Sequence, residues 1–251
     1  MKVAVLVSGV CKTSHPLGDL NKFNKRQQRF FPGADFYYAT WKSFKDELDE
    51  IEDAVHTWYY DEPDPHYHPY LGVPVDAHVS PHFTERVNWA KGLDNKKVQW
   101  TKQHAKQHLI HAWLFDNANI KDNYDVVVRA RFDGFIHKNA DFSPYLEDSF
   151  KNKNVHGFSV TRQNMFDKLY HSPMEKGSKH SVYMLDQMII HSADRFDTEM
   201  VYKLYKEKKL HAAEFGWYQV LSQPYGGIHR NHHGFVNHDK NVLDRFLLDL
   251  E

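Results

Sequence analysis

Two arginines and an aspartate at alternate positions are the residues of this chain best suited to chemistry. Arg129, Arg131 and Asp133 follow the β-branched run 126–128 and precede Gly134. Because side chains alternate along a strand, all three would lie on the same face. Two cations beside one carboxylate suit a phosphorylated ligand with a metal nearby, and a structural ion-pair ladder is the alternative. The functional interpretation is favoured because burying these charges beside an apolar strand is costly unless they are paired or meet ligand charge.

The end of the first predicted strand is a second candidate site. The apolar run 3–7 predicts a central strand, and it is followed by Ser8, Gly9, Lys12 and Thr13. In an open α/β sheet, ligands bind beyond the carboxyl ends of the strands. Gly9 would let the backbone approach a ligand closely, and Lys12 could meet a phosphate. An ordinary strand-to-loop turn is an equally good interpretation, because the glycine spacings of a Walker loop or a dinucleotide fingerprint are missing.

Two acidic positions could serve an acceptor hydroxyl. Asp186 and Gln187 stand before the apolar run 188–190, where a carboxylate could act as a base or bind a sugar hydroxyl. A turn or N-cap role for Asp186 stays open. Glu214 begins a predicted helix, where it could support Asp186 or simply gain from the helix dipole. Trp217 could stack on a sugar, although a core position is the more frequent role of tryptophan.

The chain has 19 histidines, which makes metal binding a possibility to weigh. His229 and His232 lie in the glycine- and histidine-rich stretch 226–238, predicted to be a loop, and their spacing allows a metal ligand or a phosphate contact. Histidines are scattered through the whole chain, however, so local pairs arise by chance. No His-Glu-x-x-His helix is present.

Composition favours one globular domain spanning residues 1–251, with 41% hydrophobic residues and a net charge of -1. A near-neutral net charge argues against binding to nucleic acid or an anionic membrane through overall electrostatic attraction. Cys11 is the only cysteine, so there is no internal disulfide framework. No apolar run approaches the roughly 20 residues of a transmembrane helix, and the expected place of work is the cytoplasm.

The order of predicted elements indicates an α/β fold with a mostly parallel sheet flanked by helices. The expected strands are 3–7, 34–41, 54–60, 124–132, 155–160 and 183–191. The expected helices are 21–31, 99–118, 193–209 with Ser192 as N-cap, 212–222 and 241–250. The stretch 45–53 is expected to be a short helix or loop. The proline-rich stretch 61–81 predicts a long ordered loop over a site.

The motifs in their order also resemble a known family. They read KVAVLVSGVCKT, DFYYATW, YDVVVRARFD, DQMIIHSADRF and AAEFGWYQVL. Together they are similar to a group of bacterial and viral glycosyltransferases that includes WavE-like lipopolysaccharide-synthesis proteins, and the resemblance spans at least residues 2–221. It implies a GT-A-like nucleotide-diphospho-sugar fold. It also places Asp133 at the metal-binding Asp-x-Asp motif, with Arg131 where the family pattern has the first aspartate.

The resemblance implies transfer of a sugar from a nucleotide-diphospho-sugar donor to a hydroxyl of a glycan, a lipopolysaccharide or a modified nucleic-acid base. Mn²⁺ or Mg²⁺ would have a single carboxylate from the motif, and Arg131 would replace part of its charge. No obligate protein partner is evident. Two alternatives stay open: a metal-dependent phosphodiester hydrolase using the histidine-rich loops, and a non-catalytic nucleotide- or carbohydrate-binding protein.

The residues expected to take part fall into three groups. The catalytic group is Asp186, Asp133 and Glu214. The metal-binding group is Asp133, His229 and His232. The donor-binding group is Ser8, Gly9, Lys12, Thr13, Trp41, Arg129, Arg131, Gln187 and Trp217.

Overall fold

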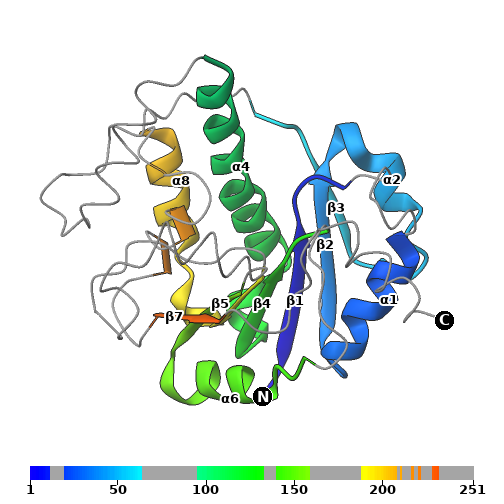
Figure 1. Cartoon of the computed structure of the whole chain (residues 1–251), viewed down its shortest axis with the longest axis vertical. Coiled ribbons are helices and arrows are strands. Elements are labelled where there is room, and N and C mark those ends of the chain that lie inside the picture. The colour runs from blue at the N-terminus through cyan, green and yellow to red at the C-terminus, as the bar shows by residue number, and fades with distance from the viewer. Residues whose placement is uncertain are drawn as a thin grey trace, which may run out of the picture.

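A computed structural model describes most of the sheet and the helices beside it. The described residues are 1–11, 20–63, 95–132, 140–158, 188–207, 210, 216–217, 220–221 and 228–231, without the side chains of 22–23, 95–105 and 228–231. Seven strands form one sheet in the order β3-β2-β1-β4-β6-β5-β7 (Figure 1). They are β1 (Val3–Ser8), β2 (Asp35–Trp41), β3 (Thr57–Tyr60), β4 (Val126–Ala130), β5 (Val155–Phe158), β6 (Met188–Ser192) and β7 (Ile228–Asn231).

The sheet is mostly parallel. β1 pairs in parallel with β2 and β4, β2 with β3, and β5 with β7. Among the described strands only β6 runs the other way, antiparallel to β4 and β5. The expected α/β class, a mostly parallel sheet flanked by helices, is confirmed.

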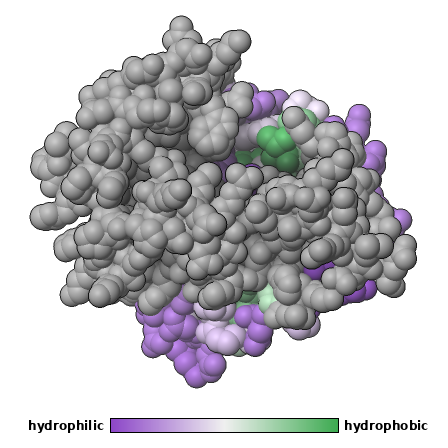
Figure 2. Space-filling model, in the orientation of Figure 1, coloured by the Kyte–Doolittle hydropathy of each residue, from purple (hydrophilic) through white to green (hydrophobic). Residues whose placement is uncertain are grey.

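Helices cover both faces of this sheet. The bounds are α1 (Leu20–Phe30), α2 (Lys45–Asp49), α4 (Asn95–Asn117), α5 (Ile120–Asn123), α6 (Ser143–Asn152) and α8 (Thr198–Lys206), with short 3₁₀ turns η1 (Lys42–Phe44) and η4 (Ala193–Arg195). Figure 1 shows α4 and α8 on one side of the sheet and α1 and α2 on the other. Figure 2 shows hydrophilic side chains gathered at the bottom of the same view, where Figure 1 places α6. Within the described part of the chain, no helix combines the length and the apolarity that a membrane crossing requires.

Two cores explain why the central strands are apolar throughout. On β1, Leu6 belongs to the core under α4, together with Ile110. Val5 and Val7 belong to the core on the α1 side, together with Phe31. A strand covered on both faces needs apolar side chains at every position, and this produces the continuous run in place of an alternating one.

Three local expectations differ from the structure. Ser192 does not begin a long helix, because buried Phe196 is extended and separates η4 from α8. α8 is capped instead by Asp197, whose carboxylate accepts a hydrogen bond from the Met200 N–H at 3.0 Å. The predicted loop 226–238 contains β7, which forms by pairing with β5. The helix α6 was not anticipated.

Two other expected elements cannot be compared with the fold. The helix 241–250 lies outside the described residues, as does most of the proline-rich loop.

Candidate functional site

The carboxyl edge of the sheet gathers the strand ends that flank the predicted residues. The chain leaves β1 at Ser8 and β4 at Ala130 on this edge, because the two strands are parallel and paired. It enters antiparallel β6 at the same edge, since Met188 stands opposite Ala130. It leaves β7 there at Asn231, because β7 is parallel to β5. Residues that directly follow or precede these four strand ends are therefore brought to one edge by the topology.

Gly9 makes the turn after β1. Its φ of 132° lies in a region that favours glycine, and a Cβ added there would meet no atom of the described residues within 4 Å. The described part of the chain therefore leaves space beside the backbone at this point. Ser8, the last residue of β1, is buried, and its hydroxyl has no hydrogen-bond partner among the described residues.

Thr40 on β2 holds the Gly9 turn in place. The Gly9 N–H donates to the Ala39 carbonyl at 3.1 Å. The Thr40 hydroxyl donates to the Gly9 carbonyl at 2.9 Å and accepts from the Cys11 N–H at 3.4 Å. Sequence reasoning missed Thr40, because its role depends on the pairing of β1 with β2.

The thiol of Cys11 is buried behind the same turn. Burial, with a smaller contribution from the carboxylates of Glu47 and Glu50, raises the pKa of Cys11 to about 12. The thiol is therefore protonated near neutral pH and is not available as a nucleophile.

Arg129 projects from β4 into the α4 side of the molecule. Its side chain is 1% exposed. Its Nη2 donates to Gln107 Oε1 at 2.7 Å, and its Cζ lies 4.9 Å from the ring centroid of Trp217. Val128 and Ala130 belong to the opposite core, so the predicted alternation along β4 is confirmed. Arg129 is thus an interior cation and not a group at the open strand end.

Arg131 stands just past the end of β4 and is half-buried. Its carbonyl accepts a hydrogen bond from Gln27 Nε2 of α1 at 3.1 Å. Phe132, the next residue, is buried in the α1-side core. These two contacts fix the backbone at the point where the chain leaves β4.

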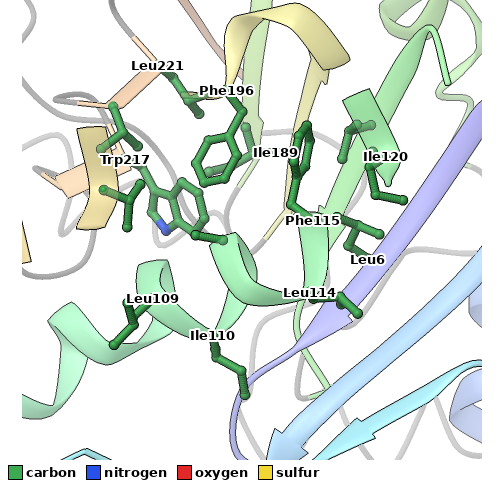
Figure 3. Packing of buried hydrophobic residues seen from close by; sticks show 14 of the residues in the cluster. Leu6, Leu109, Ile110, Leu114, Phe115, Ile120, Ile189, Phe196, Trp217 and Leu221 are labelled. Atoms are coloured by element: carbon green, nitrogen blue, oxygen red, sulfur yellow. The ribbon is translucent and has the colours of Figure 1, made fainter. Parts of the chain in front are cut away.

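The two predicted donor-binding tryptophans are both buried in the core under α4. The ring centroid of Trp217 lies 4.5 Å from that of His108, 5.2 Å from that of His111 and 6.0 Å from that of Phe196. Figure 3 shows Trp217 and Phe196 side by side above α4. The ring of Trp41 packs edge-on against Trp113. Both indole rings therefore contact core side chains.

Sequence reasoning missed two of the fully buried histidines, His111, whose ring packs against Trp217, and His191, whose ring packs against Phe196. The pKa of His191 is lowered to about 4, mainly by burial. The pKa of His111 is lowered well below its usual value by burial, with His191, Arg129 and His108 adding to the effect. His191 Nδ1 donates to the Ser192 carbonyl at 2.8 Å, while neither ring nitrogen of His111 has a hydrogen-bond partner within the described part of the chain. Both imidazoles are neutral at pH 7.

The other predicted site residues lie outside the described residues. These are Lys12, Thr13, Asp133, Asp186, Gln187, Glu214 and His232, and the side chain of His229 is not described either. Within the described ranges no three His, Cys, Asp or Glu side chains form a group that could hold a metal ion. The described residues therefore provide no metal site, and the metal roles of Asp133, His229 and His232 stay predictions.

Comparison with known proteins finds similar solved structures at low sequence identity. No family model and no curated protein matches the chain. Among solved structures, core-mannan synthase A (CmsA/Ktr4) of Aspergillus fumigatus in its Mn/GDP form is 13% identical, with a TM-score of 0.41 over 90% of this chain and 72% of that one. A glycosyltransferase involved in glycosylation of the major capsid of PBCV-1 is 11% identical, with a TM-score of 0.41 over 92% and 82%.

A third similar structure has a different activity. The 4-diphosphocytidyl-2C-methyl-D-erythritol synthase of Anaerococcus prevotii is 9% identical, with a TM-score of 0.42 over 99% of this chain and 94% of that one. At such identities and TM-scores these likenesses carry no argument about activity, and one fold hosts many activities in any case. The function must be argued from the chain's own site.

Proposed function

We propose that residues 1–251 form a glycosyltransferase domain that moves a sugar from a nucleotide-diphospho-sugar to an acceptor hydroxyl. The observation that carries the proposal is the meeting of four strand ends at one edge of the sheet. Lys12, Asp133, Asp186 and His232 each stand within a few residues of one of these ends in the sequence.

The open turn at Gly9 and the chain exit at Arg131 lie on neighbouring strands, because Val7 pairs with Ala130. Adjacent strands are about 4.8 Å apart, which a diphosphate can span. A ligand whose phosphates approach the Gly9 backbone would therefore also be close to the guanidinium-bearing end of β4. Arg131 and Lys12 are the proposed cations for this diphosphate, with Asp133 beside them.

The transfer itself breaks the bond between the anomeric carbon and the diphosphate oxygen and forms a bond from that carbon to the acceptor oxygen. Asp186 is the proposed base that takes the acceptor proton, with Glu214 in support. The cations would stabilise the charge that develops on the departing nucleoside diphosphate. Mn²⁺ or Mg²⁺ held by Asp133 would supply further charge neutralisation. The acceptor is proposed to be a glycan or a modified nucleic-acid base, and the place of work the cytoplasm.

A thermal-shift panel tests this function. UDP-, GDP-, CDP- and ADP-sugars are added with and without Mn²⁺, and a true donor raises the melting temperature by mass action. Arg131→Met and Asp133→Ala should lose the shift and the hydrolysis of that donor. Lys151→Met, which removes an exposed charge of α6 paired with Glu147, is the control and should retain both. A panel without any shift, or an unchanged donor response in folded Asp133→Ala, would contradict the proposal.

A further inference from the structure

Two buried arginines hold one segment of the chain against the sheet. We call the described residues 216–217 and 220–221 the Trp217 segment. Arg129 of β4 lies over the ring of Trp217, and Arg195 of η4 donates through Nη2 to the Leu221 carbonyl. Both arginines are buried. Because a buried guanidinium is costly unless protein groups replace its hydration, these contacts strongly favour one position of the segment.

Arg129 is also fixed from the side of α4. Its guanidinium donates to Gln107 through Nη2 and also lies over the Trp217 ring. A lysine ammonium would keep the charge but lose this combination of contacts. The preceding residue of α4, Lys106, pairs with Glu62 at 3.1 Å in the chain that follows β3. One turn of α4 therefore joins β4, the Trp217 segment and the end of the β3 strand.

The position of Arg129 separates its role from that of Arg131. The two residues are about 6.6 Å apart along an extended chain, and Arg131 is the one at the carboxyl edge. Arg129 is 1% exposed, with Gln107 and Trp217 beside its guanidinium. A diphosphate at the edge would meet Arg131 first, and it would reach Arg129 only by displacing one of those partners.

We propose that Arg129 is a positioning residue that sets the end of β4 relative to the Trp217 segment, and does not bind the diphosphate. This inference rests on the proposed function. Glu214 stands three residues before Trp217, and Arg131 and Asp133 stand directly after β4. Arg129 thereby fixes the relative positions of the two parts of the chain that carry the proposed catalytic and diphosphate-binding groups. It replaces the sequence expectation that both arginines bind the donor.

The test separates donor affinity from turnover. Binding of UDP and GDP with Mn²⁺ is measured by calorimetry, and turnover by hydrolysis of the corresponding nucleotide sugars. Arg131→Met should weaken nucleoside diphosphate binding about tenfold or more, because a charge-assisted contact is lost. Arg129→Met should leave the Kd within about threefold and lower kcat roughly 10- to 100-fold, as a misplacement near 1 Å does. Arg129→Lys should restore kcat only in part.

Two further variants distinguish positioning from a general loss of stability. Trp217→Phe and Arg129→Met should have non-additive effects on kcat, because each removes the same contact. Arg195→Met, which releases the Trp217 segment without changing β4, should also lower kcat while leaving the Kd unchanged. Circular dichroism establishes that each variant is folded, and Arg129→Lys with Trp217→Phe carries the test if Arg129→Met does not fold.

The possible results distinguish failure of the proposed function from failure of the positioning role of Arg129. If wild-type protein binds neither UDP nor GDP and hydrolyses no nucleotide sugar, the proposed function fails, and the role of Arg129 fails with it. If wild-type protein binds and a folded Arg129 variant loses affinity as Arg131→Met does, Arg129 is a ligand and only the present inference is overturned. An Arg129 variant with wild-type kcat, or additive effects with Trp217→Phe, also overturns it.

Discussion

Acidification should destabilise this fold through two buried neutral histidines, His111 of α4 and His191 of β6. The pKa of His191 is about 4 in the folded chain, against about 6.5 for an exposed histidine. The unfolded state therefore binds more protons between these two values. Stability is fully present above the unfolded pKa of about 6.5 and is lost progressively as the pH falls towards the folded pKa.

The size of the effect follows from the shift. A depression of about 2.5 pKa units corresponds to about 3 kcal/mol, which is a large part of the 5–15 kcal/mol that stabilises a typical domain. The cause is geometric. Complete burial of the ring lowers the pKa most, the hydrogen bond to the Ser192 carbonyl raises it in part, and Arg195 lowers it further while Asp194 partly offsets that charge. His111, with Arg129 and His108 nearby, adds to the loss in the same pH range.

The assay is urea unfolding of wild type and His191→Asn between pH 7 and pH 4. An asparagine amide can donate to the Ser192 carbonyl as Nδ1 does, but it cannot titrate. Histidines away from this pair titrate equally in both proteins, so the difference between the two curves reports His191 together with its effect on His111. Wild type should lose about 3 kcal/mol more unfolding free energy than the variant. Parallel curves would refute the assigned burial of a neutral imidazole.

Three further predictions concern single positions. Gly9→Ala should lower the unfolding free energy by about 1–3 kcal/mol, measured in urea, because its φ of 132° strains any side chain although space is available. Asp197→Ala should cost about 1 kcal/mol through loss of the α8 N-cap, and Asp197→Asn should cost much less. Cys11 should resist alkylation at pH 8 in the folded chain and react after unfolding, because its pKa is raised to about 12 by burial.

The Gly9 prediction has a control variant, and the other two predictions have outcomes that would contradict them. Gly33 has a φ of 78°, so Gly33→Ala should show comparable strain away from the proposed site, whereas only Gly9→Ala should also weaken nucleotide binding. An Asp197→Ala variant as stable as wild type would contradict the capping bond to Met200. Alkylation of native Cys11 at the rate of a free thiol would contradict its burial.

The sequence alone was sufficient to predict the two central strands at the site, β1 and β4. The apolar runs of β1 and β4 predicted central strands, and both are buried. The alternation of Arg129 with Val128 and Ala130 predicted opposite faces of β4, which the two cores confirm. These features are local, because side-chain periodicity depends only on the backbone conformation of neighbouring residues.

Secondary-structure boundaries were less predictable. β7 lies in a stretch rich in glycine and histidine, and it is a strand because β5 offers a pairing edge. Asp197, and not Ser192, caps α8, because Phe196 is extended and buried and the helix begins only after it. In both cases a distant packing partner outweighs the local preference.

Arg129 and Arg131 show what the sequence alone determines and what only the tertiary structure decides. The residue pattern determined that Arg129 and Arg131 are cations near the end of a buried strand. Only the fold decided that Arg129 is bonded to Gln107 and stacked on Trp217, while the chain leaves the sheet at Arg131. A local pattern specifies the direction of a side chain but not what lies there. The partner is set by long-range packing of segments that are remote in the sequence.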